Sequence, residues 1–196
     1  MELNPLTALS PIDGRYARQT DALRDIFSEC AFMNARVRVE VEWLISLSEA
    51  GFAELPHLSD HGKAFLRGLA DNFSLADCEA IKEIEKTTNH DVKAVEYWIK
   101  NQVAHDEELK SASEFVHFSC TSEDINNTSH AIMLKRGREA LADYLQQIHD
   151  TIAGFAHQWA EIPMLSRTHG QTASPTTVGK EFANVAVRLE RVIEAI

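Results

Sequence analysis

The sequence has few of the residues that interrupt regular structure, and it has no long apolar run. Its 196 residues include eight glycines, five prolines and three cysteines. Neither glycine nor proline occurs from Leu69 to Arg136, and because turn-rich β architectures need such residues, this stretch favours helices. No run approaches the ~18 apolar residues of a membrane span, and no secretory signal is recognisable at the N-terminus. We therefore expect a mainly helical protein that makes no membrane contact.

The cysteines and the charge exclude several classes of function. Cys30, Cys78 and Cys120 form an odd, widely spaced set, which suggests neither a disulfide framework nor a zinc site, so reduced thiols in a cytoplasmic protein fit best. The net charge of −11 argues against a general binder of nucleic acid or anionic membranes, because phosphates would be repelled. His57 and His61 have an i, i+4 spacing but no third ligand, so we expect no metal.

Apolar spacing predicts a series of helices in the first half of the chain. The expected ranges are about 21–50, 59–73, 75–86 and 91–104, with polar breaks at 87–89, 111–113 and 119–122. Ser59 and a capping box that begins at Ser74 are typical helix starts, and Gly51 is a fitting stop.

The second half predicts one long helix. Apolar residues recur from Ile125 to Trp159, in heptad-like steps from Leu141 onward, so a helix from Ser122 to Ala160 would suit a bundle shared between chains. Two helices broken near Gly137 are the alternative. Residues 164–174 are expected to be extended or looping, and Pro175 and Thr176 to start another helix. Because the sequence ends without a helix-stop signal, we expect it to be the N-terminal part of a longer protein.

Two polar clusters lie in expected turns or at helix starts, where binding groups are often found. In the turn 13–16, Arg15 can grip a phosphate or carboxylate and Tyr16 adds a hydroxyl, with an ordinary surface turn as the alternative. In the second cluster, Asn89, His90 and Asp91 stand at the positive end of a helix and Lys93 adds charge. Ordinary capping beside a solvated lysine is the alternative there.

Two further segments carry hydroxyl and imidazole groups. Thr121 and Ser122 stand at the start of the expected long helix, where hydroxyls and unpaired backbone N–H groups suit a carboxylate. His169 lies between Thr168 and Gln171 in a glycine-containing segment, which makes it a candidate acid or base near neutral pH. A helix cap and a structural histidine are the respective alternatives. The phosphate-loop, dinucleotide and nucleophile-elbow motifs are all missing.

Taken together, these segments resemble the adenylosuccinate lyase family of the fumarase/aspartase superfamily. Five stretches carry the resemblance, in the family's order and over nearly the whole chain: Ser10–Tyr16, Thr87–Glu96, Thr121–Asn127, Ser166–Gln171 and Pro175–Glu181. The Asn-His-Asp-Val-Lys-Ala run separates this family from fumarases and argininosuccinate lyases. One departure is Thr172, where the family commonly has proline, and we expect it to affect the backbone more than the chemistry.

The resemblance implies a β-elimination that uses no metal or organic cofactor. Adenylosuccinate would yield AMP and fumarate, and SAICAR would yield AICAR and fumarate. His169 would be the general acid toward the leaving nitrogen. The implied substrate contacts are Arg15 and Tyr16 at the phosphate, Asn89, His90 and Asp91 at the nucleotide and succinyl groups, Thr121 and Ser122 at a carboxylate, Thr168 beside the acid, and Lys93 and Gln171 as second-rank candidates. The family's general base is a serine on a flexible loop, and no such loop occurs in this sequence.

The resemblance also implies an all-α, L-aspartase-like fold. A small N-terminal helical domain, 1–111, would precede the first part of a long-helix bundle domain, 112–196. The implied partners are a small nucleotide substrate and three further copies of the protein, which would share active sites in a cytoplasmic homotetramer. Two alternatives stay open: a non-catalytic helical oligomerisation fragment, and a sister lyase that releases fumarate from another substrate.

Overall fold

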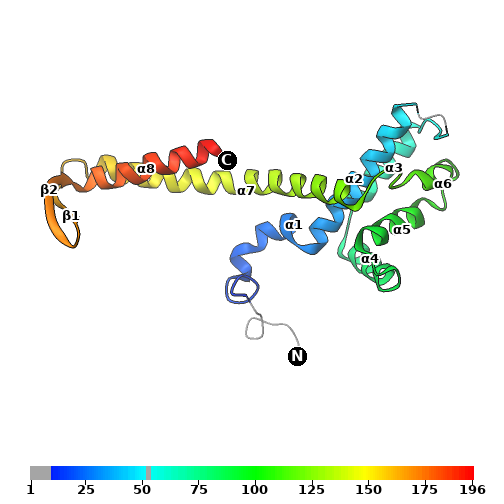
Figure 1. The fold of residues 1–196 in the computed structure, drawn as a ribbon, viewed down its shortest axis with the longest axis horizontal. Helices are drawn as coiled ribbons and strands as arrows, with labels where there is room; N and C mark the ends of the chain where they lie inside the picture. Colours follow the sequence, from blue (N-terminus) through cyan, green and yellow to red (C-terminus); the bar gives the residue numbers. More distant parts are fainter. Residues whose placement is uncertain (1–9, 52–53) are drawn as a thin grey trace. The chain divides into compact units, whose positions relative to one another are not determined.

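The structure is a computed structural model that describes residues 10–51 and 54–196. The elements in these ranges are helices and one β-hairpin (Figure 1). In chain order they are η1 (Ala17–Leu23), α1 (Arg24–Phe27), α2 (Glu29–Glu49), α3 (Asp60–Asp71), α4 (Leu75–Thr88), α5 (Asp91–Val103), α6 (Glu107–Ala112), η2 (Ser113–Phe115), α7 (Ser122–Gln158), β1 (Pro163–Thr168), β2 (Gln171–Thr177) and α8 (Val178–Ala195). Among the described residues, every helix is too short or too polar to span a membrane.

The chain divides into two compact units, Met1–Arg136 and Gly137–Ile196. In the first unit, α2 is the central helix and packs against α3, α4 and α5 (Figure 1). Its core includes the predicted inner face of α5, because Val92, Val95, Trp98, Ile99 and Val103 are all buried. Burial of this face confirms the helical spacing predicted for residues 91–104.

Several helix boundaries in the first unit were predictable from capping residues. Ser59 accepts a hydrogen bond from Gly62 N at 3.1 Å, and Ser74 and Asp77 form the expected capping box at the start of α4. The single helix expected over 21–50 is wrong, because Ser28 interrupts it. The backbone of Ser28 is extended (ψ 164°), and its hydroxyl caps α2 by accepting a hydrogen bond from Ala31 N at 3.2 Å.

Two of the three cysteines are paired, which corrects the expectation of reduced thiols. A disulfide joins Cys30 on α2 to Cys78 on α4, with Cα atoms 5.7 Å apart, a normal separation for such a bond. Because the two cysteines are 48 positions apart in sequence, their spacing gave no sign that the two thiols meet. Cys120 is a free thiol, and partial burial raises its pKa.

Helix α7 is continuous over its 37 residues, so the alternative of a break near Gly137 is wrong. In the second unit, the end of α7 packs against the start of α8. The ring of Phe182 lies 5.6 Å from that of Phe155 and 5.2 Å from that of Trp159. Gly179 permits this contact, since a Cβ atom there would lie 2.6 Å from the Ala160 Cα atom.

The segment between α7 and α8 is an antiparallel hairpin, and the predicted helix start at Pro175 and Thr176 is wrong. Both residues belong to β2, where Pro175 pairs with Leu165 of β1. Pro175 is tolerated because β2 is an edge strand. Helix α8 begins only at Val178, after Thr177 has turned to an extended conformation and capped the Lys180 N–H at 3.2 Å.

Candidate functional site

The α4–α5 corner presents the Asn89–Asp91 segment. Asn89 ends α4 in the left-handed conformation (φ 50°, ψ 30°), which asparagine tolerates better than most residues. His90 is the N-cap of α5, and its Nδ1 atom accepts a hydrogen bond from the backbone N–H of Lys93 at 3.2 Å. Because Nδ1 is an acceptor, the neutral ring carries its proton on Nε2.

Two segments predicted from sequence meet at His90. Its Nε2 atom lies 3.5 Å from Ser122 Oγ at the start of α7. Next to Ser122, the backbone N–H and the hydroxyl of Thr121 both donate to Asp124 Oδ2, at 2.7 and 2.9 Å. These two hydrogen bonds lower the pKa of the Asp124 carboxyl. The hydroxyl of Thr121 is thus engaged by the Asp124 carboxylate, whereas that of Ser122 faces an imidazole.

A buried arginine that no sequence motif marks contacts Asp91 and Asn126 beside these residues. Arg36 on α2 donates from Nη2 to Asp91 Oδ2 at 2.6 Å and from Nε to Asn126 Oδ1 at 2.9 Å. Burial opposes the charged form of Asp91, but hydrogen bonds from Arg36 and from the Val92 N–H lower the pKa of this carboxyl below its usual range. Nothing in the sequence marks Arg36, because an arginine within a helix is usually solvated.

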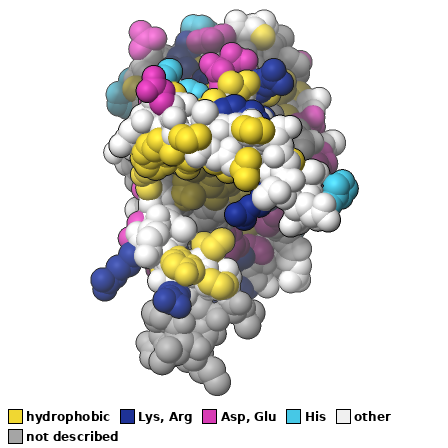
Figure 2. Space-filling view, turned by 90° about the vertical axis from the view of Figure 1, so that its left-hand side faces the viewer, with side chains coloured by type: hydrophobic (Ala, Val, Ile, Leu, Met, Phe, Trp, Pro, Cys, Tyr) yellow, Lys and Arg dark blue, Asp and Glu magenta, His cyan; other side chains and the backbone are white. Residues whose placement is uncertain are grey.

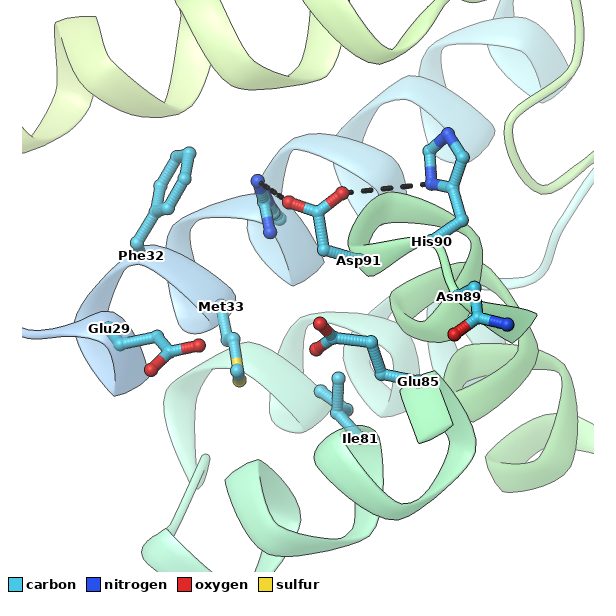
Figure 3. Close-up of a pocket in the computed structure, with 9 residues that line it drawn as sticks. Glu29, Phe32, Met33, Ile81, Glu85, Asn89, His90 and Asp91 are labelled. Carbon is cyan, nitrogen blue, oxygen red and sulfur yellow. Dashed lines mark hydrogen bonds and ion pairs between the residues drawn. The ribbon is translucent and has the colours of Figure 1, made fainter. Parts of the chain in front are cut away.

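A cavity of about 350 Å³ opens beside this corner (Figure 3). It is lined by Glu29, Phe32, Met33, Arg36, Ile81, Glu85, Asn89, His90 and Asp91, which come from α2, α4 and the α4–α5 corner. Its carboxylates are paired with cations. The Nζ atom of Lys82 forms ion pairs with Glu85 Oε2 at 2.8 Å and with Glu29 Oε1 at 2.9 Å. These two interactions raise the pKa of Lys82 to about 12.

A second buried ion pair supports the loop that leads into α7. His117 has a positive φ of 65°, and its Nδ1 atom lies 2.6 Å from Glu40 Oε1 on α2. The bond with Glu40 raises the pKa of His117, against the effect of burial. No local sequence pattern marks His117 for this role, because its partner lies 77 residues away along the chain.

The remaining predicted residues of the first unit make other contacts. Lys93 Nζ bonds the largely buried Glu96 at 2.6 Å, so its charge is locally compensated. The Arg15 guanidinium lies 5.8 Å from the centre of the Tyr16 ring, and the Tyr16 N–H donates to Pro11 O at 2.8 Å. The side chain of Tyr16 is about half exposed. The interactions found for Arg15 and Tyr16 are thus local, with residues between 11 and 20.

In the second unit, the hairpin brings Thr168, His169 and Gln171 together. Thr168 pairs with Gln171, so His169 and Gly170 alone form the turn between the strands. Both have positive φ values, 51° and 73°, as the tightest hairpin turns require. The imidazole of His169 is therefore presented at an exposed tip.

Comparison with known proteins identifies the family. Residues 14–196 match the protein family described as "Lyase". The chain belongs to this lyase family. Among the residues that the structure describes, no cluster of three or more histidine, cysteine, aspartate or glutamate side chains is arranged to hold a metal ion.

Curated members of the lyase family are similar over almost the whole chain. It is 54% identical to adenylosuccinate lyase from Vibrio cholerae, 55% identical to that from Haemophilus influenzae and 53% identical to that from Escherichia coli. Each match covers 97% of this chain and 42% of the relative, in the relative's N-terminal part. These matches confirm the resemblance predicted from the motifs.

Solved structures confirm the fold. A fumarate lyase from a Mesorhizobium species matches with a TM-score of 0.67 and 21% identity, over 88% of this chain and 40% of the other. The 3-carboxy-cis,cis-muconate lactonizing enzyme from Pseudomonas putida matches with a TM-score of 0.69 and 23% identity, over 89% of this chain and 38% of the other. The predicted helical, L-aspartase-like fold of this lyase family is therefore correct.

Proposed function

We propose that the chain is the N-terminal part of an adenylosuccinate lyase of purine nucleotide biosynthesis. It would help to eliminate fumarate from adenylosuccinate, which yields AMP, and from SAICAR, which yields AICAR. The observation that carries the proposal is the identity of 53–55% with adenylosuccinate lyases over 97% of the chain. The 3.5 Å approach of His90 to Ser122 supports it, because it joins two of the motifs that mark the family.

The proposed elimination needs an acid at the leaving nitrogen and groups that hold the anionic substrate. We assign the acid to His169, since its exposed place in a two-residue turn leaves the ring accessible. The proposed substrate contacts are Arg15, Tyr16, Asn89, His90, Asp91, Thr121, Ser122 and Thr168, with Lys93 and Gln171 in a secondary role. No metal or organic cofactor has a part in this scheme. The serine base would come from sequence outside this chain.

We further propose that the protein is a cytoplasmic homotetramer whose subunits share active sites. The support is a set of exposed apolar side chains in the second unit: Leu141 and Ile148 on α7 are 42% and 50% exposed, and Val185 and Val192 on α8 are 49% and 51% exposed. Figure 2, which views the molecule from the left-hand side of Figure 1, shows hydrophobic side chains at the surface among charged ones. In this assembly, residues 1–111 would form the first domain and 112–196 the first part of the bundle domain.

A substitution of His169 in the full-length protein tests the proposed acid. His169→Ala should lower kcat for fumarate release from adenylosuccinate by about 10²–10⁴-fold, because a positioned acid or base contributes that much. His157→Ala is the matched control, since this histidine is an exposed residue of α7 in the same unit. An unchanged kcat in the His169 variant would reject the assignment.

A second candidate function is a helical oligomerisation module without activity of its own. The chain spans about two fifths of the length of its curated relatives, which favours this reading for the 196 residues alone. The purified chain should then oligomerise in sedimentation experiments without releasing fumarate. Fumarate release by the isolated chain would exclude this candidate. Release from a different succinyl substrate by the full-length protein, with none from adenylosuccinate, would indicate a sister lyase instead.

A further inference from the structure

Arg36 links three elements that converge on the candidate site. It projects from α2, its Nη2 atom bonds Asp91 at the N-terminus of α5, and its Nε atom bonds Asn126 in the first turns of α7. His90 and Ser122, which lie 3.5 Å apart, stand next to these two contacts. We propose that Arg36 is a positioning residue, which holds Asp91 and α7 so that His90 keeps its Nε2–H directed at Ser122.

The environment of Arg36 fixes its orientation. Its side chain is only 5% exposed, and its guanidinium lies over the Phe32 ring, 3.9 Å from the ring centre. Phe32 is in turn stacked on His130 of α7, with centroids 4.5 Å apart and planes 12° from parallel. A planar guanidinium can sit flat on a ring and donate from its edge in two directions, whereas an ammonium group cannot do both.

The contact that Arg36 makes with Asp91 decides which atom of His90 carries the proton. Asp91 Oδ1 accepts the Val92 N–H at 2.9 Å and lies 3.7 Å from His90 Nδ1, the second interaction marked in Figure 3. While Arg36 neutralises Asp91, His90 Nδ1 is an acceptor for the Lys93 N–H. Without the guanidinium, the carboxylate would draw a proton to Nδ1, and Nε2 would become an acceptor facing Ser122.

The tautomer of His90 can be measured directly on the chain. With ¹⁵N-labelled histidine at about pH 8.5, well above the usual histidine pKa, NMR distinguishes an Nε2–H ring from an Nδ1–H ring. We expect Nε2–H in the native chain and mainly Nδ1–H in Arg36→Met and in Arg36→Gln. Arg36→Lys should keep Nε2–H, because an ammonium group can still pair with Asp91.

Two controls separate this effect from a general disturbance. Arg38→Met removes an arginine from the same helix that pairs with Asp71 at 2.6 Å, away from His90, and should leave the tautomer unchanged. The double variant Arg36→Met/Asp91→Asn should return His90 to Nε2–H, since no carboxylate then competes for the ring. A folded Arg36→Met or Arg36→Gln chain that retains Nε2–H would overturn the proposal, and so would a double variant that fails to restore it.

The consequence for catalysis rests on the proposed lyase function and needs the full-length protein. Arg36→Met should lower kcat by about 10²-fold with a smaller change in KM, because misplacing a group near the reacting atoms costs about that much, and Arg36→Lys should recover part of the loss. A native protein without lyase activity would refute the proposed function but not the tautomer result. Native kcat in Arg36→Met would refute the positioning role.

Discussion

The disulfide between α2 and α4 gives a stability prediction that can be worked out from its position. Cys30 and Cys78 enclose a loop of 48 residues in sequence. In the chain-entropy description, closing such a loop removes about 14 cal/mol/K from the unfolded state, which corresponds to about 4 kcal/mol at 25 °C. The free energy of unfolding measured in urea should therefore be about 4 kcal/mol larger for the oxidised protein than for the reduced protein.

The test compares urea unfolding, followed by circular dichroism, with and without a reducing agent. The double variant Cys30→Ala/Cys78→Ala should show no response to reductant, and Cys120→Ser should keep the full response because Cys120 is unpaired. Alkylation before reduction should label one thiol per chain, and alkylation after reduction should label three. Three reactive thiols in the oxidised chain, or the same midpoint with and without reductant, would refute the reasoning.

Two other predictions concern a buried ion pair and a close helix contact. The hydrogen bond to Glu40 raises the pKa of His117 in the folded protein. The pair therefore contributes its full stabilisation at pH values below the pKa of histidine in the unfolded chain, about 6.5. This contribution is lost as the pH rises through the raised pKa of His117 in the folded protein. Glu40→Gln should remove this pH dependence from the free energy of unfolding, and an unaltered profile would contradict it. Gly179→Ala should destabilise the second unit by about 1–3 kcal/mol in thermal unfolding, because its Cβ atom would approach Ala160. Gly154→Ala should instead stabilise the protein by about 0.5–1 kcal/mol, because a Cβ atom at this position on α7 would meet open space. Equal changes in stability for the Gly154 and Gly179 variants would show that the contact at Gly179 is not tight.

Local signals in the sequence were sufficient for most helices. The capping box at Ser74 and the cap at Ser59 mark helix starts through contacts within four residues, and the structure confirms both. The interruption at Ser28 was missed, because apolar residues continue on both sides of it. The hairpin was missed for another reason: its strands pair only with each other, and Pro175 is usually a sign of a helix start or a loop.

The candidate site was predictable only where its residues belong to continuous motifs. Asn89–Asp91 and Thr121–Ser122 were selected as segments, and the structure brings His90 to Ser122. Arg36 and Glu40 could not be found in this way, because each acts on a partner more than fifty residues away. Such pairs depend on how α2 packs beneath α5 and the loop before α7, which no local pattern encodes.

The joint between α7 and α8 has a consequence for how this part of the chain can vary. The Trp159 carbonyl accepts a hydrogen bond from the Gly179 N–H, and the Ile162 carbonyl accepts one from the Val178 N–H, both at 2.9 Å. These hydrogen bonds lie at the base of the hairpin segment formed by residues 163–177. They join the two helices through backbone atoms that lie outside this segment or at its edge. A hairpin of another length or turn sequence can therefore replace this one while the α7–α8 contact stays the same. The turn that carries His169 can thus change in evolution independently of the two helices.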